Sequence, residues 1–275
     1  MSKALALFIC ACAVPSTGAQ AAELVLDGLV AWVTVVPEAR SDFAVEVQPG
    51  RGSLPPVTVT QDGGRAVLTN GVEVGACAQA NGSLQVGLRG GGRAEMREAP
   101  RVIVHAPRTL RVSGTNSGLI GTIGPSADLD IRQVGCAFWD VADVAGMLQV
   151  EMSGGASLTA GAVGAALLRA SAGGAITTGP VADLVAEASS GGSVRVASAL
   201  GAVEASASAG GWIEIEGGQA TTLRANASGG GRIEHDGRIA ALSASASSGG
   251  RVEVSQTDDV ISRSVSGGGQ VIVGN

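Results

Sequence analysis

The sequence predicts an all-β protein: a right-handed parallel β-helix of about nine coils, preceded by a cap of short strands. Three observations lead to this prediction. A glycine-rich corner returns about every 19 residues from Leu110 to the C-terminus. Apolar and polar residues alternate beside each corner, as in strands with one buried face. The composition, with 43 Gly but three Trp, three Phe and no Tyr, suits tight turns around a narrow core.

Residues 1–21 have the features of a secretory signal peptide. Lys3 precedes an apolar run from Ala4 to Val14, and small residues follow, so we place cleavage after Ala21. The apolar run is too short to span a bilayer as a helix. Lipoprotein processing at Cys12 is the alternative, but the residues before it match a lipobox poorly. We therefore expect export to the periplasm or cell surface of a bacterium, with no membrane span in the mature chain.

Residues 22–105 are expected to form short strands that cap the repeat domain at residues 106–275. The strand candidates are residues 24–36, 42–48, 57–60, 66–69, 83–88 and 101–105. The segments at 57–60 and 66–69 flank Gln61-Asp62-Gly63-Gly64 and so predict a hairpin. Pro107 ends the last strand, and the first repeat follows.

Each repeat is located by the last small residue of its corner. These residues are spaced by 18 to 20 positions. They are Gly118, Ala137, Ala156, Gly174, Gly192, Gly211, Gly231, Gly250 and Gly269. Glycine suits these corners because the chain turns sharply, often with a positive φ, and because adjacent coils crowd the backbone.

Apolar columns flank the corners. The position two residues after the corner is apolar in all nine copies. It holds Ile120, Trp139, Leu158, Ile176, Val194, Ile213, Ile233, Val252 and Val271. Before the corner, a column of large apolar residues is followed four positions later by alanines in the later copies. Alternate residues of a strand face opposite sides, so these columns predict a core in which large residues face small ones.

A period near 20 residues with two strands per copy predicts one coil per copy. Coils about 4.8 Å apart would give a stack of roughly 43 Å. Parallel crossovers are nearly always right-handed, so we expect that hand here. A β-propeller is the alternative, but its blades need about 40 residues. Arg263 stands in the last copy where other copies have a small apolar residue, which is typical of a terminal coil that faces water.

Two cysteines, Cys77 and Cys136, lie outside the signal peptide. An even pair in an exported protein favours a disulfide, which here would pin the N-terminal region to the second coil. Two separate buried thiols are the alternative. Neither cysteine has a His or another Cys at zinc-ligand spacing.

Three glutamates occupy the same outward position in successive copies. They are Glu214, Glu234 and Glu253. Stacked carboxylates occur at cation sites and in β-helical carbohydrate-active enzymes. We favour the alternative, a solvated face on which Arg195, Arg232 and Arg251 balance the charge. Trp212 also falls on the expected outward face, with Phe138 and Leu119, and an exposed aromatic ring can contact a sugar or another chain.

The sequence contains no nucleophile elbow, phosphate-binding loop, dinucleotide fingerprint or zinc motif. Of its two histidines, His235 falls in an apolar column and is expected to be a hydrogen-bonded structural residue beside a turn. His105 lies in the strand before the repeats, with no acid or nucleophile expected near it. We therefore predict no catalytic residue, no metal site and no cofactor, and classify the protein as a non-enzyme.

The exported strand-rich N-terminal part, the Val-x-x-Pro segment at residues 104–107 and the Leu-x-x-x-x-Ser-Gly corners resemble the auto-transporter adhesin head GIN domain family. The resemblance covers roughly residues 29–275 and rests on pattern more than on one motif. It implies a β-helical bacterial envelope protein, sometimes discussed as adhesive. The corners depart from the family's Ser-Gly-Ser-Gly-Asp, which puts any role of corner aspartates in doubt. Here Gly-Gly is followed by Ser193, Trp212, Arg232, Arg251 or Gln270.

These features favour a non-enzymatic adhesion or interaction scaffold whose partner is an envelope protein or a glycan. The formal net charge of −6 argues against a nucleic-acid partner. A carbohydrate-active enzyme, of polysaccharide lyase or glycosidase type, is the alternative, disfavoured by one lysine, two histidines and few aromatic residues. End-to-end self-assembly is a third hypothesis, disfavoured by the polar last coil and the N-terminal cap.

Overall fold

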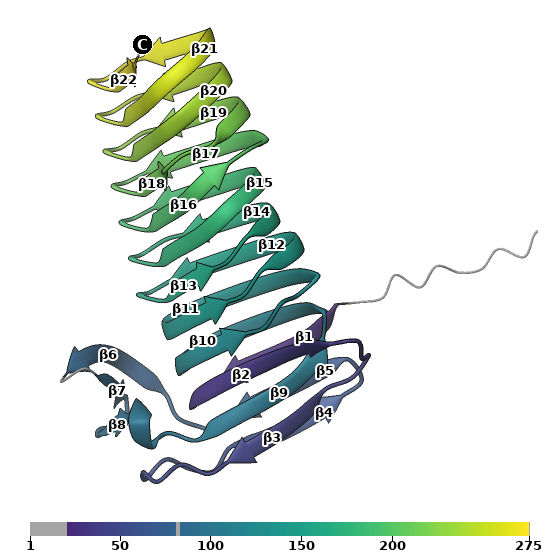
Figure 1. The fold of residues 1–275 in the computed structure, drawn as a ribbon. Helices are drawn as coiled ribbons and strands as arrows, with labels where there is room; N and C mark the ends of the chain where they lie inside the picture. The colour runs from purple at the N-terminus through teal and green to yellow at the C-terminus, as the bar shows by residue number, and fades with distance from the viewer. Residues whose placement is uncertain (1–20, 81–82, 275) are drawn as a thin grey trace, which may run out of the picture.

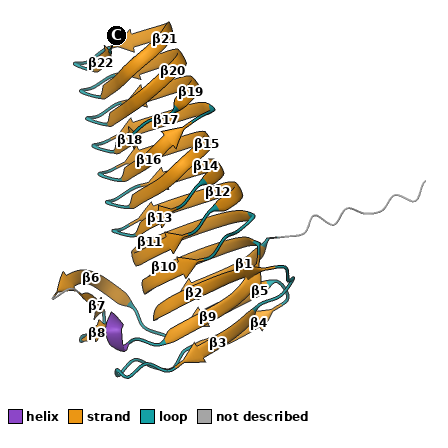
Figure 2. Cartoon of the chain, in the orientation of Figure 1, coloured by secondary structure: helices purple, strands orange, loops and turns teal. Residues whose placement is uncertain are grey.

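The computed structural model describes residues 21–80 and 83–274, so the expected signal peptide lies outside the described residues except for Ala21. The described chain forms a long stack of coils, with a small lobe beside its N-terminal end (Figure 1). Strands dominate the structure, as Figure 2 shows. Successive coils pair in parallel, which confirms the predicted parallel β-helix. The described residues include no helix long and apolar enough to cross a membrane.

Nineteen strands form the sheet of the stack. They are β1 (Ala22–Asp27), β2 (Val30–Glu38), β3 (Ala44–Gln48), β4 (Thr58–Asp62), β5 (Arg65–Thr69), β9 (Arg101–Pro107), β10 (Thr109–Ile123), β11 (Asp128–Val141), β12 (Val144–Ser153), β13 (Ser157–Ala160), β14 (Val163–Ala170), β15 (Ala175–Ser189), β16 (Ser193–Ala199), β17 (Ala202–Ser208), β18 (Trp212–Ile215), β19 (Gln219–Ala227), β20 (Arg232–Ala246), β21 (Arg251–Val265) and β22 (Gln270–Val273). The lobe contains β6 (Val74–Ala80), β7 (Ser83–Leu88), β8 (Arg93–Glu95) and the 3-10 helix η1 (Met96–Glu98).

Each corner is a tight turn, and the geometry of the turn explains why glycine recurs there. In the corner at residues 171–174, Ala172 has φ of 47° and Gly173 has φ of 80°. The N–H of Gly174 donates to the carbonyl of Ser171 at 2.8 Å. Two successive positive φ values and this bond define a type I′ turn, which glycine adopts without strain. A Cβ on Gly174 would collide with the carbonyl oxygen of Met152 in the preceding coil.

The first corner is shifted by one residue from the predicted position. Leu119, rather than Gly118, lies opposite Ala137, because the register of β10 shifts between Gly114 and Ser117. The predictions that Ile120 faces the core and that Leu119 faces outward are therefore wrong. Leu119 is fully buried in the stack, whereas Ile120 packs against the lobe.

The stack begins earlier in the chain than the repeat spacing predicts. Strands β1 and β2 form a complete coil, in which Leu24 lies opposite Val112 and Ala31 opposite Leu119. Beneath this coil lie β5 and β9, which pair in parallel with β1 and β2. The first coil and the coil of β10 are neighbours although about 88 residues separate them, as in the pair Ala22–Leu110. A 19-residue period in the sequence does not reveal a neighbour at this separation.

The two ends of the stack differ. At the N-terminal end, β3 pairs antiparallel with β9, and β4 pairs antiparallel with β5, so reversed strands close this end. At the other end, Val260, Ile261 and Val265 are 43%, 66% and 48% exposed on the last coil. Arg263 lies across this end and donates from Nη2 to the carbonyl of Val271 at 2.6 Å. The last coil therefore exposes more apolar surface than predicted.

Candidate functional site

The predicted glutamates do lie side by side on the outer surface of the stack. Glu214 on β18 lies beside Glu234 on β20, and Glu234 lies beside Glu253 on β21. Arg195 of β16 precedes them in the same column. Successive side chains of a strand point to opposite faces. Ile213 and Ile215, which flank Glu214, are buried, so Glu214 points outward. Strand register thus brings three carboxylates together at the spacing of adjacent strands, about 4.8 Å.

Arginines neutralise this row of carboxylates. Arg195 pairs with Glu214 at 2.7 Å, and Arg251 with Glu253 at 3.0 Å. Arg232 pairs with Glu234 and lies 3.6 Å from Glu253. The hydrogen bond that Arg195 donates to Glu214 raises the pKa of Arg195. No group of three His, Cys, Asp or Glu suited to hold a metal ion occurs among residues 21–80 and 83–274.

Trp212 lies in the outward column beside the glutamates, between Ser193 and Arg232. The Arg195 guanidinium stacks over its ring, 5.1 Å from the ring centroid. The indole N–H is buried and has no hydrogen-bond partner in the part of the chain that the structure describes. We call the surface formed by this ring and the surrounding ion pairs the charged face. It consists of Arg195, Trp212, Glu214, Arg232, Glu234, Arg251 and Glu253.

The surroundings of the two histidines differ. His235 is fully buried in the apolar column between Ile215 and Val254. Its Nδ1 accepts a hydrogen bond from the N–H of Gly237 at 3.0 Å, and burial lowers its pKa. His105 does have an acid beside it, contrary to the sequence expectation, because parallel pairing of β2 and β9 brings Glu38 within 2.8 Å of its Nδ1.

A disulfide joins the lobe to the stack. Cys77 on β6 is bonded to Cys136 at the corner of β11, with a Cα–Cα distance of 5.9 Å. The lobe also covers three outward apolar residues of successive coils, Trp32, Ile120 and Phe138. The next three residues in this column are Ser157, Ala175 and Ser193. The outward column is therefore large and apolar where the lobe covers it, and small in the next three coils, after which Trp212 follows.

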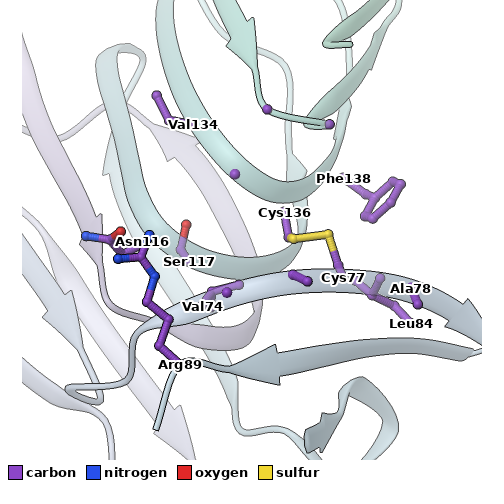
Figure 3. Close-up of a pocket in the computed structure, with 15 residues that line it drawn as sticks. Val74, Cys77, Ala78, Leu84, Arg89, Asn116, Ser117, Val134, Cys136 and Phe138 are labelled. Carbon is purple, nitrogen blue, oxygen red and sulfur yellow. A yellow bond between two sulfur atoms is a disulfide. The ribbon is translucent and has the colours of Figure 1, made fainter. Parts of the chain in front are cut away.

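A cavity of about 470 Å³ opens where the lobe meets the corners of β10 and β11 (Figure 3). The lobe contributes Val74, Cys77, Leu84 and Arg89 to the walls, and the stack contributes Asn116, Ser117, Val134, Cys136 and Phe138. This cavity was not predicted from the sequence. One signal was present, since the corners Thr115-Asn116-Ser117-Gly118 and Val134-Gly135-Cys136-Ala137 lack the Ser-x-Gly-Gly pattern of later coils.

Comparison with known proteins adds no relative to these observations: no family model, curated protein or solved structure matches the chain significantly.

Proposed function

We propose that this protein is an exported, non-enzymatic scaffold of the bacterial cell envelope or surface that binds an envelope protein or a glycan through its charged face. The single observation that carries the proposal is the position of Trp212 on an outward face of a long regular stack. The later coils present no other Trp or Phe on this column, which runs on through Arg232, Arg251 and Gln270. The Trp212 ring is half-buried with the Arg195 guanidinium over it, and its exposed part together with the surrounding ion pairs offers an apolar contact and hydrogen bonds to a sugar or a protein.

The pairing of the glutamates supports binding over catalysis. Glycoside hydrolysis needs two carboxyl groups in different protonation states. Each glutamate of the charged face is instead engaged by an arginine side chain. His235 is buried. The carbohydrate-active enzyme therefore has no structural observation in its favour and is kept as an outcome of the test.

The proposed location follows from the sequence and from the disulfide. Disulfides persist in oxidising compartments such as the periplasm and the cell surface. The Cys77–Cys136 bond supports export through the expected signal peptide. Membership of the head GIN domain family is part of the same proposal and rests on the strand-rich N-terminal part, the Val-x-x-Pro segment at residues 104–107 and the repeated Leu-x-x-x-x-Ser-Gly pattern.

The experiment is a binding screen of residues 22–275 against arrays of glycans and polysaccharides and against extracts of cell-envelope proteins. Trp212→Ala is expected to weaken any specific binding by tenfold or more, about the loss of one stacked aromatic contact. Thr221→Ala, at an exposed position outside the charged face, is the matched control and should bind like the parent. Binding that Trp212→Ala leaves unchanged would refute the charged face as the contact surface. Release of reducing sugar from a bound polysaccharide would refute the non-enzymatic scaffold.

A further inference from the structure

The cavity beneath the lobe has a polar end and an apolar end. Asn116 and Arg89 lie at the polar end, where Figure 3 shows Arg89 extending toward Asn116. Phe138 and Leu84 lie at the other end, beside the disulfide (Figure 3). The volume of the cavity falls in the range of small-molecule sites, which occur preferentially where two structural units meet.

The charge of the cavity is positive. Among the described residues that line it, Arg89 is the only charged one. Arg89 is exposed, and none of the ion pairs among the described residues involves it. The sequence also makes room for this side chain, because a Cβ at Gly75 would lie 3.3 Å from Cγ of Arg89. In a chain of net charge −6, an arginine without an ion pair therefore lines a cavity whose described walls contain no carboxylate.

The stack is irregular at the wall of the cavity that β10 forms. Asn116 has φ of 48°, close to the 47° of Ala172 in a regular corner, so the irregularity lies in the strand register rather than in this angle. Asn116 lies within the register shift of β10 between Gly114 and Ser117. Behind it, the amide of Gln133 donates to the Ser117 hydroxyl at 3.0 Å, and both residues are buried. A buried polar pair holds this irregular corner, and the irregularity places the Asn116 amide at the cavity.

We propose that this cavity binds a small organic monocarboxylate, with the carboxylate on Arg89 and Asn116 and the apolar body against Leu84 and Phe138. A planar guanidinium matches a carboxylate through two parallel hydrogen bonds. A single cation favours a monoanion over a phosphate dianion, which usually meets several cations. The apolar end favours a ring or a branched chain over a fully hydroxylated body. This site is separate from the charged face, and neither proposal depends on the other.

The test is a titration of the disulfide-bonded protein, residues 22–275, with benzoate, followed by NMR of the backbone amides and by calorimetry. Benzoate should bind saturably with a Kd of about 1 mM or tighter, a modest affinity for a ligand of this size. The shifted amides should map to residues 74–78 and 84–89 of the lobe and to residues 116–117 and 134–138 of the stack. Benzamide, which lacks the charge, and acetate, which lacks the ring, should each bind at least tenfold more weakly.

The decisive variant is Arg89→Gln, with Arg93→Gln as the matched control. Arg93 is also an exposed arginine of the lobe but does not line this cavity. Arg89→Gln should weaken benzoate binding by about 10- to 100-fold, as expected for the loss of a charge-assisted pair, and Arg93→Gln should have no effect. Circular dichroism and the intact mass will show that both variants are folded and disulfide-bonded. The proposal is overturned if benzoate does not bind saturably, if benzamide binds as well, or if both variants behave alike.

Discussion

At the scale of single residues, the glycine at the end of each corner is required by the neighbouring coil rather than by its own backbone angles. Gly192 has no positive φ, yet a Cβ there would collide with the carbonyl oxygen of Ala170. The same collision with the preceding coil recurs at Gly211, Gly231 and Gly250. The preceding glycines, such as Gly191 with φ of 76°, are required by the turn itself. Two adjacent glycines of one corner are therefore required for different physical reasons.

We predict that Gly192→Ala lowers the free energy of unfolding by about 1–3 kcal/mol, the usual cost of overpacking. The added methyl group has no flexible neighbour to displace, since it meets backbone. Gly217→Ala is the control, because its Cβ would lie 3.7 Å from the nearest atom, the carbonyl oxygen of Ala197. It should change stability by less than about 0.5 kcal/mol. Urea denaturation followed by circular dichroism measures both, and equal stabilities would contradict the argument.

A second residue-scale prediction concerns His235. Burial lowers its pKa in the folded state, below the unfolded-state value of about 6.5. The unfolded chain therefore takes up the proton first as the pH falls. The contribution of neutral His235 to stability is complete above about pH 6.5 and is lost as the pH falls toward the folded-state pKa.

His235→Val should remove this pH dependence, since valine matches Val254 in the same column. We expect the variant to gain stability over the parent on going from about pH 8 to about pH 5. Urea denaturation at the two pH values measures the gain. Parallel pH profiles for the two proteins would show that His235 titrates alike in the folded and unfolded states.

At the scale of elements, the lobe is a separate three-stranded sheet attached to the side of the stack. Apolar packing on Trp32, Ile120 and Phe138 holds it, together with the disulfide. The indole N–H of Trp32 also donates to the carbonyl of Met96 at 2.6 Å. Since the coils pair among themselves without the lobe, loosening it leaves their ladders intact.

We therefore predict that the double variant Cys77→Ala/Cys136→Ala keeps the stack and loosens the lobe. Amide hydrogens of residues 74–80 and 83–88 should exchange faster, while those of β14 to β20 keep their protection. The free energy of unfolding should fall by about 2–4 kcal/mol. Hydrogen exchange measured by mass spectrometry distinguishes the two regions. Unchanged exchange in the lobe would mean that apolar packing alone holds it.

At the scale of the whole molecule, the stack is asymmetric along its axis. Reversed strands close the N-terminal end. The second half of β21 pairs with β20 on one side, and in the described part of the chain no strand covers its other side. Exposed apolar residues on such an edge favour association with other chains.

The corresponding prediction is that Ile261→Lys lowers self-association of the 22–275 chain, because a lysine on an edge strand opposes pairing with a second chain. Ile261 is 66% exposed, so stability should change by less than about 0.5 kcal/mol. Thr221→Lys, on the side of the stack, adds the same charge as a control. Sedimentation velocity over a range of concentrations measures the effect, and equal association of the two variants would contradict it.

The sequence by itself determined the repeat, the corners and the inward columns of the later coils. These features are local, since one coil contacts mainly the next, and a period of about 19 residues records each contact. The register that aligns Glu214, Glu234 and Glu253 follows from the same period. The Cys77–Cys136 pair was also predictable, because two cysteines allow one intramolecular bond.

Only the tertiary structure decided which segments meet across long distances in the chain. Strand β1 enters the stack between β5 and β10, and β2 enters it between β9 and β10, and no period marks that position. The bulge at Asn116 moved the first corner by one residue, because an extra residue in a strand changes which side chains face inward. The cavity at Arg89 has one wall from the lobe and one from the stack. Its chemistry exists only when both are folded, since the residues of each wall come from segments that no local pattern connects.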